Sequence, residues 1–137
     1  MKEVPIGARA HTSETVEHKH TLTHHHAELP PVYSTPDMVR LMETACFHAL
    51  MPFHEPGEIN VGTAIHVEHR AATGVGVEVH AEAVMESFDG RFYTMRVRAW
   101  TQDPKDTTGE KELGRGTISR AVVHVPTFLA KTKNGKP

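Results

Sequence analysis

Cysteine is almost absent from this chain, and so is any long apolar run. A single cysteine among 137 residues excludes an internal disulfide framework, which agrees with a reducing compartment. No apolar run approaches the ~20 residues that are needed to span a bilayer. The first residues, MKEVPIGARAHTSE, lack the apolar core of a signal peptide, so we expect a cytoplasmic protein.

An excess of charge of either sign is also lacking. The 15 basic and 17 acidic residues give a net charge of -2. Nucleic acids and anionic membranes attract proteins through dense basic surfaces, so this balance predicts neither of them as a partner. A chain of this length is expected to form one domain that buries about two-thirds of its unfolded surface. We expect flexible ends at about residues 1–7 and 132–137.

Histidine, in contrast, is abundant. Twelve histidines occur, and the densest stretch is HKHTLTHHH at residues 18–26. On a strand, His18 and His20 would point the same way, and a metal could then recruit one of His24 to His26. No cysteine pair, HExxH helix or facial carboxylate–histidine pattern accompanies them. We therefore expect a solvated segment without metal or other cofactor, and a metal site remains the alternative interpretation.

The segment PDMVRLMETACFHALM, from Pro36 to Met51, has the periodicity of one amphipathic helix. At about 100° per residue, its apolar side chains surround Glu43, and Cys46 lies among them as a core residue. A carboxylate on an apolar face loses hydration, which raises a carboxyl pKa. Glu43 is therefore a candidate acid, base or nucleophile, with a satisfied structural carboxylate as the alternative. Thr35 is expected to cap this helix.

The sequence VGTAIHVEHRAA predicts a strand after the helix. Alternation places Val61, Thr63, Ile65, Val67 and His69 on one face, which we expect to face the core. His69 is thus a second titratable group on an apolar row. The structural alternative is a core histidine that is bonded to a backbone carbonyl.

Three further strands are predicted after this one, at residues 75–87, 91–102 and 113–125, and an extended segment precedes the helix at about residues 8–23. The dipeptide DG at 89–90 indicates a hairpin. One long helix wrapped by an antiparallel sheet of about five strands makes an α+β domain. Because long strands leave an exposed edge, we expect a homodimer or a dimer of dimers.

This order of elements resembles the hotdog fold, and three segments carry a closer likeness. STPDMVRLMETAC, EPGEINVGTAIHVEHRAAT and GRGTISRAVVHVPTFLAK resemble segments of the fluoroacetyl-CoA thioesterase family, and the likeness extends from about Leu29 to Lys131. It implies hydrolysis of an acyl-CoA thioester, with catalytic positions at Thr35, Glu43 and His69. Glu43 would act as nucleophile or base, His69 as proton shuttle and Thr35 as a positioning hydroxyl.

The resemblance also suggests substrate contacts. In the fluoroacetate-resistance enzyme of this family, two phenylalanines cover the acyl pocket, and the corresponding positions here are His26 and Leu29. Without that aromatic lid, we expect a short- or medium-chain acyl-CoA substrate. The Gly62 region is a candidate for stabilising the oxyanion. Arg120, with the basic tail from Lys131, is a candidate for binding the phosphates of CoA.

Two other functions stay open from the sequence: a non-catalytic acyl-CoA or small-ligand binding protein, and a hotdog hydratase or dehydratase. The hydratase families usually pair an aspartate and a histidine within one strand–helix segment, and no such local pair occurs here. Geometry also limits the thioesterase hypothesis, because eight helical residues separate the backbones of Thr35 and Glu43 by ~12 Å. Hotdog sites commonly lie at a dimer interface, which leaves open the subunit that supplies His69.

Overall fold

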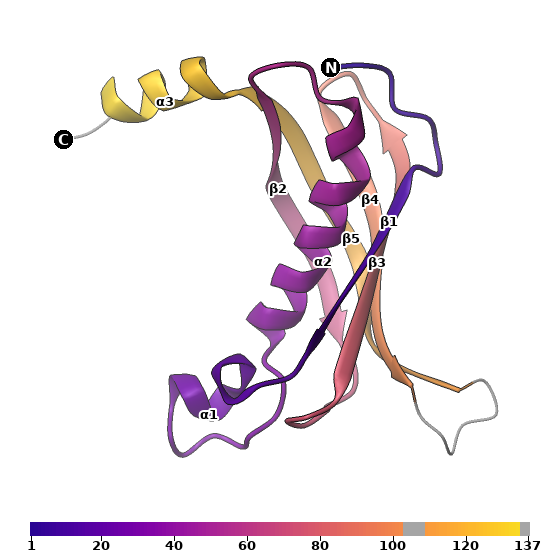
Figure 1. Cartoon of the computed structure of the whole chain (residues 1–137), viewed down its shortest axis with the longest axis vertical. Helices are drawn as coiled ribbons and strands as arrows, with labels where there is room; N and C mark the ends of the chain where they lie inside the picture. Colours follow the sequence, from indigo (N-terminus) through magenta and orange to yellow (C-terminus); the bar gives the residue numbers. More distant parts are fainter. Residues whose placement is uncertain (103–108, 135–137) are drawn as a thin grey trace.

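One long helix lies against an antiparallel sheet in the computed structural model, which describes residues 1–102 and 109–134 (Figure 1). The strands hydrogen-bond in the order β1-β3-β4-β5-β2, and each neighbouring pair is antiparallel. The predicted α+β class, with a central helix and about five strands, is confirmed. The elements are α2 (Thr35–Leu50), β1 (Arg9–Thr15), β2 (Glu58–His69), β3 (Glu78–Phe88), β4 (Phe92–Gln102) and β5 (Glu110–His124).

The start of α2 is set by a serine. The Ser34 hydroxyl accepts a hydrogen bond from the backbone N–H of Asp37 at 3.1 Å, which satisfies one of the free amides of the first turn. Thr35 is therefore the first helical residue, and the prediction that Thr35 caps the helix is wrong by one position. Both residues carry a hydroxyl on Cβ, which the sequence pattern does not distinguish. The hydroxyl of Thr35 is consequently free for another partner.

The core lies between α2 and the sheet. Buried methionines of the helix, Met38 and Met42, share this core with small strand residues such as Ala81 and Ala99, which let the helix approach the sheet closely. Cys46 is fully buried, and burial raises the pKa of its thiol to about 12. Its thiol stays protonated, so Cys46 is a core residue, as predicted.

The edge strand β2 departs from simple alternation. Its pairing with β5 shifts register between Gly62 and Ala64, and this irregularity changes which side chains face inward. Ile65 is 48% exposed, whereas His69 at the end of the strand is half-buried. The prediction of one continuous core-facing row is therefore wrong at its start, where Val61 falls on the face opposite to Ile65 and His69. Among the described strands, none pairs with the outer edge of β2, which is exposed in the single chain.

The histidine-rich segment is helical instead of extended. The first strand ends at Thr15, and two short helices follow, η1 (His18–His20) and α1 (Leu22–His25), so the predicted strand over residues 8–23 is too long. Among residues 1–102 and 109–134, no three His, Cys, Asp or Glu side chains are placed to hold a metal ion.

The chain ends contact the body of the fold to different extents. The Met1 ammonium donates to the Glu58 carboxylate at 2.9 Å, near the short helix η2 (Met51–Phe53). The last helix, α3 (Val125–Asn134), projects away from the sheet past β2 (Figure 1). A flexible end was predicted at 132–137. Residues 132–134 belong to α3, and residues 135–137 lie outside the described part of the chain. Within the described chain, no helix has the length and apolar character needed to cross a membrane.

Candidate active site

Thr35 and His69 are brought together by the fold. Thr35 Oγ1 and His69 Nδ1 lie 2.7 Å apart, although the two residues are 34 positions apart in the sequence. This contact joins the first turn of α2 to the last residue of β2. His69 Nε2 is buried and has no hydrogen-bond partner among the described residues. Buried polar atoms are nearly always paired, so Nε2 is the ring atom left for a group from outside the chain.

The pKa of His69 is suited to a group that accepts and releases protons. Burial lowers the pKa of its imidazole below the usual value of 6.5, and a hydrogen bond with the backbone of Ala71 opposes this shift more weakly. The ring is therefore neutral at neutral pH. A neutral imidazole has one donor and one acceptor nitrogen, so it can accept a proton and release it again.

A depression of about 290 Å³ adjoins this pair. Thr35 and His69 are part of its lining, and the other lining residues are mostly apolar, namely Leu22, Val32, Tyr33, Arg70, Ala71 and Ala72. The two predicted lid positions do not line it. His26 ends α1 and is exposed, and Leu29 is 42% exposed in the following loop. In the single chain, these two side chains are therefore not part of the site around His69.

Glu43 lies in a second cluster, on the inner side of the sheet. Its Oε2 atom is 3.2 Å from Arg120 Nη1, and the side chains of Glu43 and Arg120 are 33% and 6% exposed. Gly62 allows this arrangement, because a Cβ atom at that position would collide with Glu43 Oε2. A glycine in a strand often marks such a close approach. The carboxylate is thus held directly against the backbone of β2, with part of its surface open.

Asn60 fixes the arginine of this cluster. Arg120 Nε donates to Asn60 Oδ1 at 2.9 Å, and Arg120 Nη2 donates to the Asn60 carbonyl oxygen at 3.0 Å. Burial lowers the pKa of Arg120, and the nearby Cys46 and Glu43 side chains act in the opposite direction. A guanidinium stays charged in proteins, and a buried charge needs partners. Asn60 and Glu43 supply them.

This placement gives Arg120 a role that sequence reasoning missed. The sequence predicts a contact of Arg120 with CoA phosphates, and the structure adds that its guanidinium binds Asn60 and Glu43. A signal was present in the sequence, since Ile118, Arg120 and Val122 alternate along β5 and put the arginine on an apolar row. Asn60 has no such signal, because an asparagine soon after a turn usually indicates a solvated position.

The three predicted catalytic residues therefore form two half-sites in one chain. Gly62, beside Glu43, and His69, beside Thr35, lie opposite Arg120 and Gly114 of β5. Those two residues are six positions apart, which is ~20 Å along an extended strand. The described residues show no hydrogen bond from Glu43 to Thr35 or His69. Each half-site contains groups that the other lacks: one has the carboxylate, and the other has the neutral imidazole and the hydroxyl.

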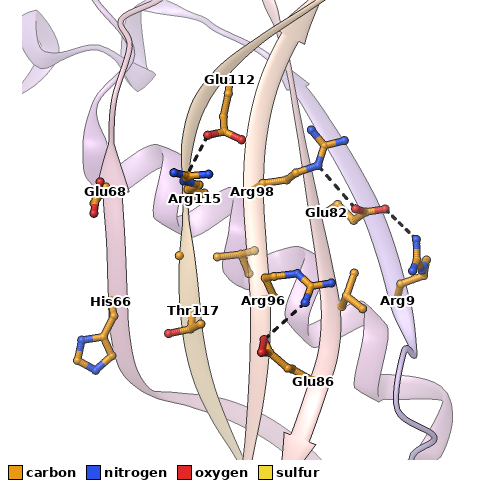
Figure 2. A pocket seen from close by; sticks show the side chains of 13 residues that line it. Arg9, His66, Glu68, Glu82, Glu86, Arg96, Arg98, Glu112, Arg115 and Thr117 are labelled. Carbon is orange, nitrogen blue, oxygen red and sulfur yellow. Dashed lines mark ion pairs between the residues drawn. The ribbon is translucent and has the colours of Figure 1, made fainter.

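A larger depression, of about 600 Å³, lies on the outer face of the sheet, with α2 behind the strands (Figure 2). It is lined by charged side chains that pair loosely with one another, such as Arg96 with Glu86 at 3.7 Å and Arg98 with Glu82 at 3.8 Å. None of the predicted site residues lines it. Exposed pairs of this kind are typical of a solvated sheet face.

Known proteins share this architecture over nearly the whole chain. A family model described as fluoroacetyl-CoA-specific thioesterase matches residues 16–126. A fluoroacetyl-CoA thioesterase from Streptantibioticus cattleyicolor is 42% identical over 124 residues, which cover 90% of this chain and 84% of that protein.

Two solved structures extend the comparison. The fluoroacetyl-CoA thioesterase FlK matches with a TM-score of 0.86 at 39% identity, covering 99% of this chain and 100% of that one. A thioesterase superfamily member from Thermus thermophilus also reaches a TM-score of 0.86, at 26% identity, with 98% and 94% of the two chains covered. The hotdog fold implied by the resemblance is confirmed.

Proposed function

Because this chain belongs to the fluoroacetyl-CoA-specific thioesterase family, we propose that it hydrolyses a short- or medium-chain acyl-CoA to the free acid and CoA. The observation that carries the proposal is the Glu43 carboxylate, which a buried arginine holds against the backbone at Gly62. A thioester carbonyl is electrophilic and its thiolate leaves readily. A carboxylate can therefore begin the chemistry, as base or as nucleophile.

Glu43 begins the reaction in one of two ways. As a base, it takes a proton from water, the water oxygen attacks the thioester carbonyl carbon, and the C–S bond then breaks to release the CoA thiolate. As a nucleophile, it attacks the carbonyl carbon itself, releases the thiolate and leaves an anhydride that water cleaves. Both routes form an oxyanion, and the backbone near Gly62 is our candidate for stabilising it.

His69 and Thr35 serve the proton transfers in this proposal. A neutral His69 accepts a proton through Nε2, the ring atom without a partner among the described residues. The proton comes from Glu43 in the base route, or from the water that cleaves the anhydride in the nucleophile route, and the imidazolium then delivers it to the CoA thiolate. The Thr35 hydroxyl holds the ring through its 2.7 Å contact with Nδ1. Thr35 is thus a positioning residue, and its role depends on not being the helix cap.

We propose that two copies of the chain complete the site. Within residues 1–102 and 109–134, no strand pairs with the outer edge of β2, which is exposed around Ile65. If two β2 strands pair antiparallel about a two-fold axis at His66, Gly62 of one copy lies opposite His69 of the partner subunit. The register shift after Gly62 leaves both residues three ladder positions from the axis. Glu43 then meets the imidazole that it lacks in its own chain.

A mixing experiment tests this composite site. Glu43→Gln and His69→Ala chains are each expected to be nearly inactive. Mixed dimers of the two, made by co-expression, contain one site with both wild-type residues and should regain part of the activity, whereas each variant alone should not. Mixed dimers that stay inactive, or light scattering that shows only single chains at micromolar concentration, would overturn the shared site.

A substrate panel tests the function itself. Acetyl- through octanoyl-CoA and fluoroacetyl-CoA are assayed with a thiol reporter, and enoyl-CoA is followed for hydration. We expect CoA release from the saturated substrates, without a preference for fluoroacetyl- over acetyl-CoA because His26 and Leu29 replace the aromatic lid. Hydration of enoyl-CoA alone would indicate a hydratase, and no reaction with any substrate would indicate a binding protein.

A further inference from the structure

A polar side chain behind Arg120 has a second partner that the proposed mechanism does not use. Asn60 is 2% exposed, and its Nδ2 atom lies 2.9 Å from His54 Nε2 and 3.4 Å from the carbonyl oxygen of Phe47. His54 directly follows η2, in the segment that connects α2 to β2. A continuous row of contacts therefore runs from His54 through Asn60 and Arg120 to Glu43.

The hydrogen-bond directions along this row are fixed by chemistry. Arg120 Nε can only donate, so the Asn60 atom that faces it must be the amide oxygen. The Asn60 NH2 group must then face His54, where it can only donate. His54 Nε2 is consequently the acceptor, and the ring is neutral with its proton on Nδ1.

The surroundings of His54 favour this neutral form. Burial lowers the pKa of His54 below 6.5, Glu58 raises it less, and the Met1 ammonium lowers it further. That ammonium lies 2.9 Å from Glu58 and 3.8 Å from Glu55, so it partly neutralises the nearby carboxylates. The neighbour of His54 on α2 is the Phe47 ring, with ring centroids 5.8 Å apart.

We propose that His54 and Asn60 are positioning residues that hold Arg120 against Glu43 only while His54 is neutral. Protonation places an N–H on His54 Nε2, directly opposite the Asn60 NH2 group. Two donors cannot bond, so the amide turns over and presents its oxygen to His54. The NH2 group of Asn60 then faces the Nε–H of Arg120, which loses its acceptor, and the guanidinium shifts relative to Glu43.

The consequence is an acid switch located away from the reacting atoms. The link between His54 and Arg120 follows from the contacts alone, whereas its effect on catalysis rests on the proposed role of Glu43. Replacement of His54 by Gln gives a matched control. A glutamine carbonyl can accept the bond from the Asn60 NH2 group but does not titrate in this pH range.

The first measurement is structural and independent of activity. The Nε–H resonance of Arg120 is followed by NMR from pH 8 to pH 5 together with the ring resonances of His54. In the wild type we expect both to change with one midpoint, which lies below pH 6.5. In His54→Gln the Arg120 signal should stay constant. A transition of Arg120 that persists in His54→Gln, or titration of His54 without any change at Arg120, would overturn the proposal.

The second measurement joins the switch to turnover. On one acyl-CoA, kcat of the wild type should fall more steeply on the acid side than kcat of His54→Gln, with KM equal in both.

Asn60→Ala should lower kcat by roughly tenfold at neutral pH with KM unchanged, because a misplaced catalytic group slows the chemical step. Identical acid limbs in wild type and His54→Gln would refute the catalytic effect. If the wild type hydrolyses no thioester, the proposed function fails, while the NMR result still decides the coupling.

Discussion

The two faces of the sheet carry the same pair of chemical groups under opposite conditions. On the outer face, Arg96 and Glu86 lie 3.7 Å apart with side chains 61% and 47% exposed. On the inner face, Arg120 and Glu43 lie 3.2 Å apart, and the arginine is 6% exposed. The outer pair is surrounded by other charges of both signs (Figure 2), whereas the inner arginine has the two additional bonds from Asn60.

The difference shows which arginine–glutamate pair the fold has to maintain. An exposed pair contributes about 0–1 kcal/mol and leaves its partners free to move in water. A buried guanidinium loses its hydration, and attraction to one carboxylate does not always offset that loss. The fold keeps such a group, fixes it with three hydrogen bonds and leaves its carboxylate partner partly open, which supports the proposed reactive role of Glu43.

The largest predicted effect separates the two pairs by activity. Glu43→Gln keeps the volume of the side chain but removes its charge, so kcat should fall by at least ~10²-fold while the protein still folds. Turnover is measured on acetyl- or octanoyl-CoA, and folding by circular dichroism. Turnover close to that of the wild type would remove Glu43 from the mechanism and leave the inner pair without a special role.

A smaller effect is expected at His69, and it depends on pH. Because burial lowers the pKa of His69, the ring stays neutral until the pH falls below 6.5, so the acid limb of kcat/KM should lie below that value. The profile is best recorded in the His54→Gln background, where His54 does not contribute. His69→Ala should lower kcat/KM by about 10²-fold, the lower end for loss of a general acid–base group. If rate and limb are both unchanged, His69 is a core histidine.

Thr35 tests whether the first residue of α2 positions the imidazole. Thr35→Val keeps the branched shape but removes the hydroxyl that contacts Nδ1, and we expect kcat to fall by roughly tenfold. Thr35→Ser keeps the hydroxyl and should stay closer to the wild type. Since Ser34 is the cap, neither variant should alter the helix, and thermal melting of both should match the wild type. An equal loss in the two variants would contradict a role for the hydroxyl.

How much of this site the sequence predicted depends on the kind of signal. The sequence singles out Glu43 because a charge interrupts a helical apolar face, and this deviation from periodicity is local. The separation of the site was predicted only in part. Helix geometry places the backbones of Thr35 and Glu43 ~12 Å apart, whereas the register shift near Gly62 occurs among ordinary residues and depends on pairing with a strand that begins almost 50 residues later. The contacts of Asn60 with His54 and Arg120 also join distant segments, which no periodicity describes.

The smallest predicted effect belongs to the outer face. Arg96→Gln removes a guanidinium from the larger depression, where its ion-pair partner is the exposed Glu86. The free energy of unfolding should change by no more than about 0.5 kcal/mol, and kcat/KM should equal that of the wild type. Chemical denaturation and the same thioesterase assay measure both quantities. Glu86→Gln is the counterpart of Glu43→Gln, since each replaces a carboxylate that faces an arginine. If Glu86→Gln or Arg96→Gln lowered kcat as strongly as Glu43→Gln, burial would not distinguish the pairs, and the reaction would have to be sought on the outer face.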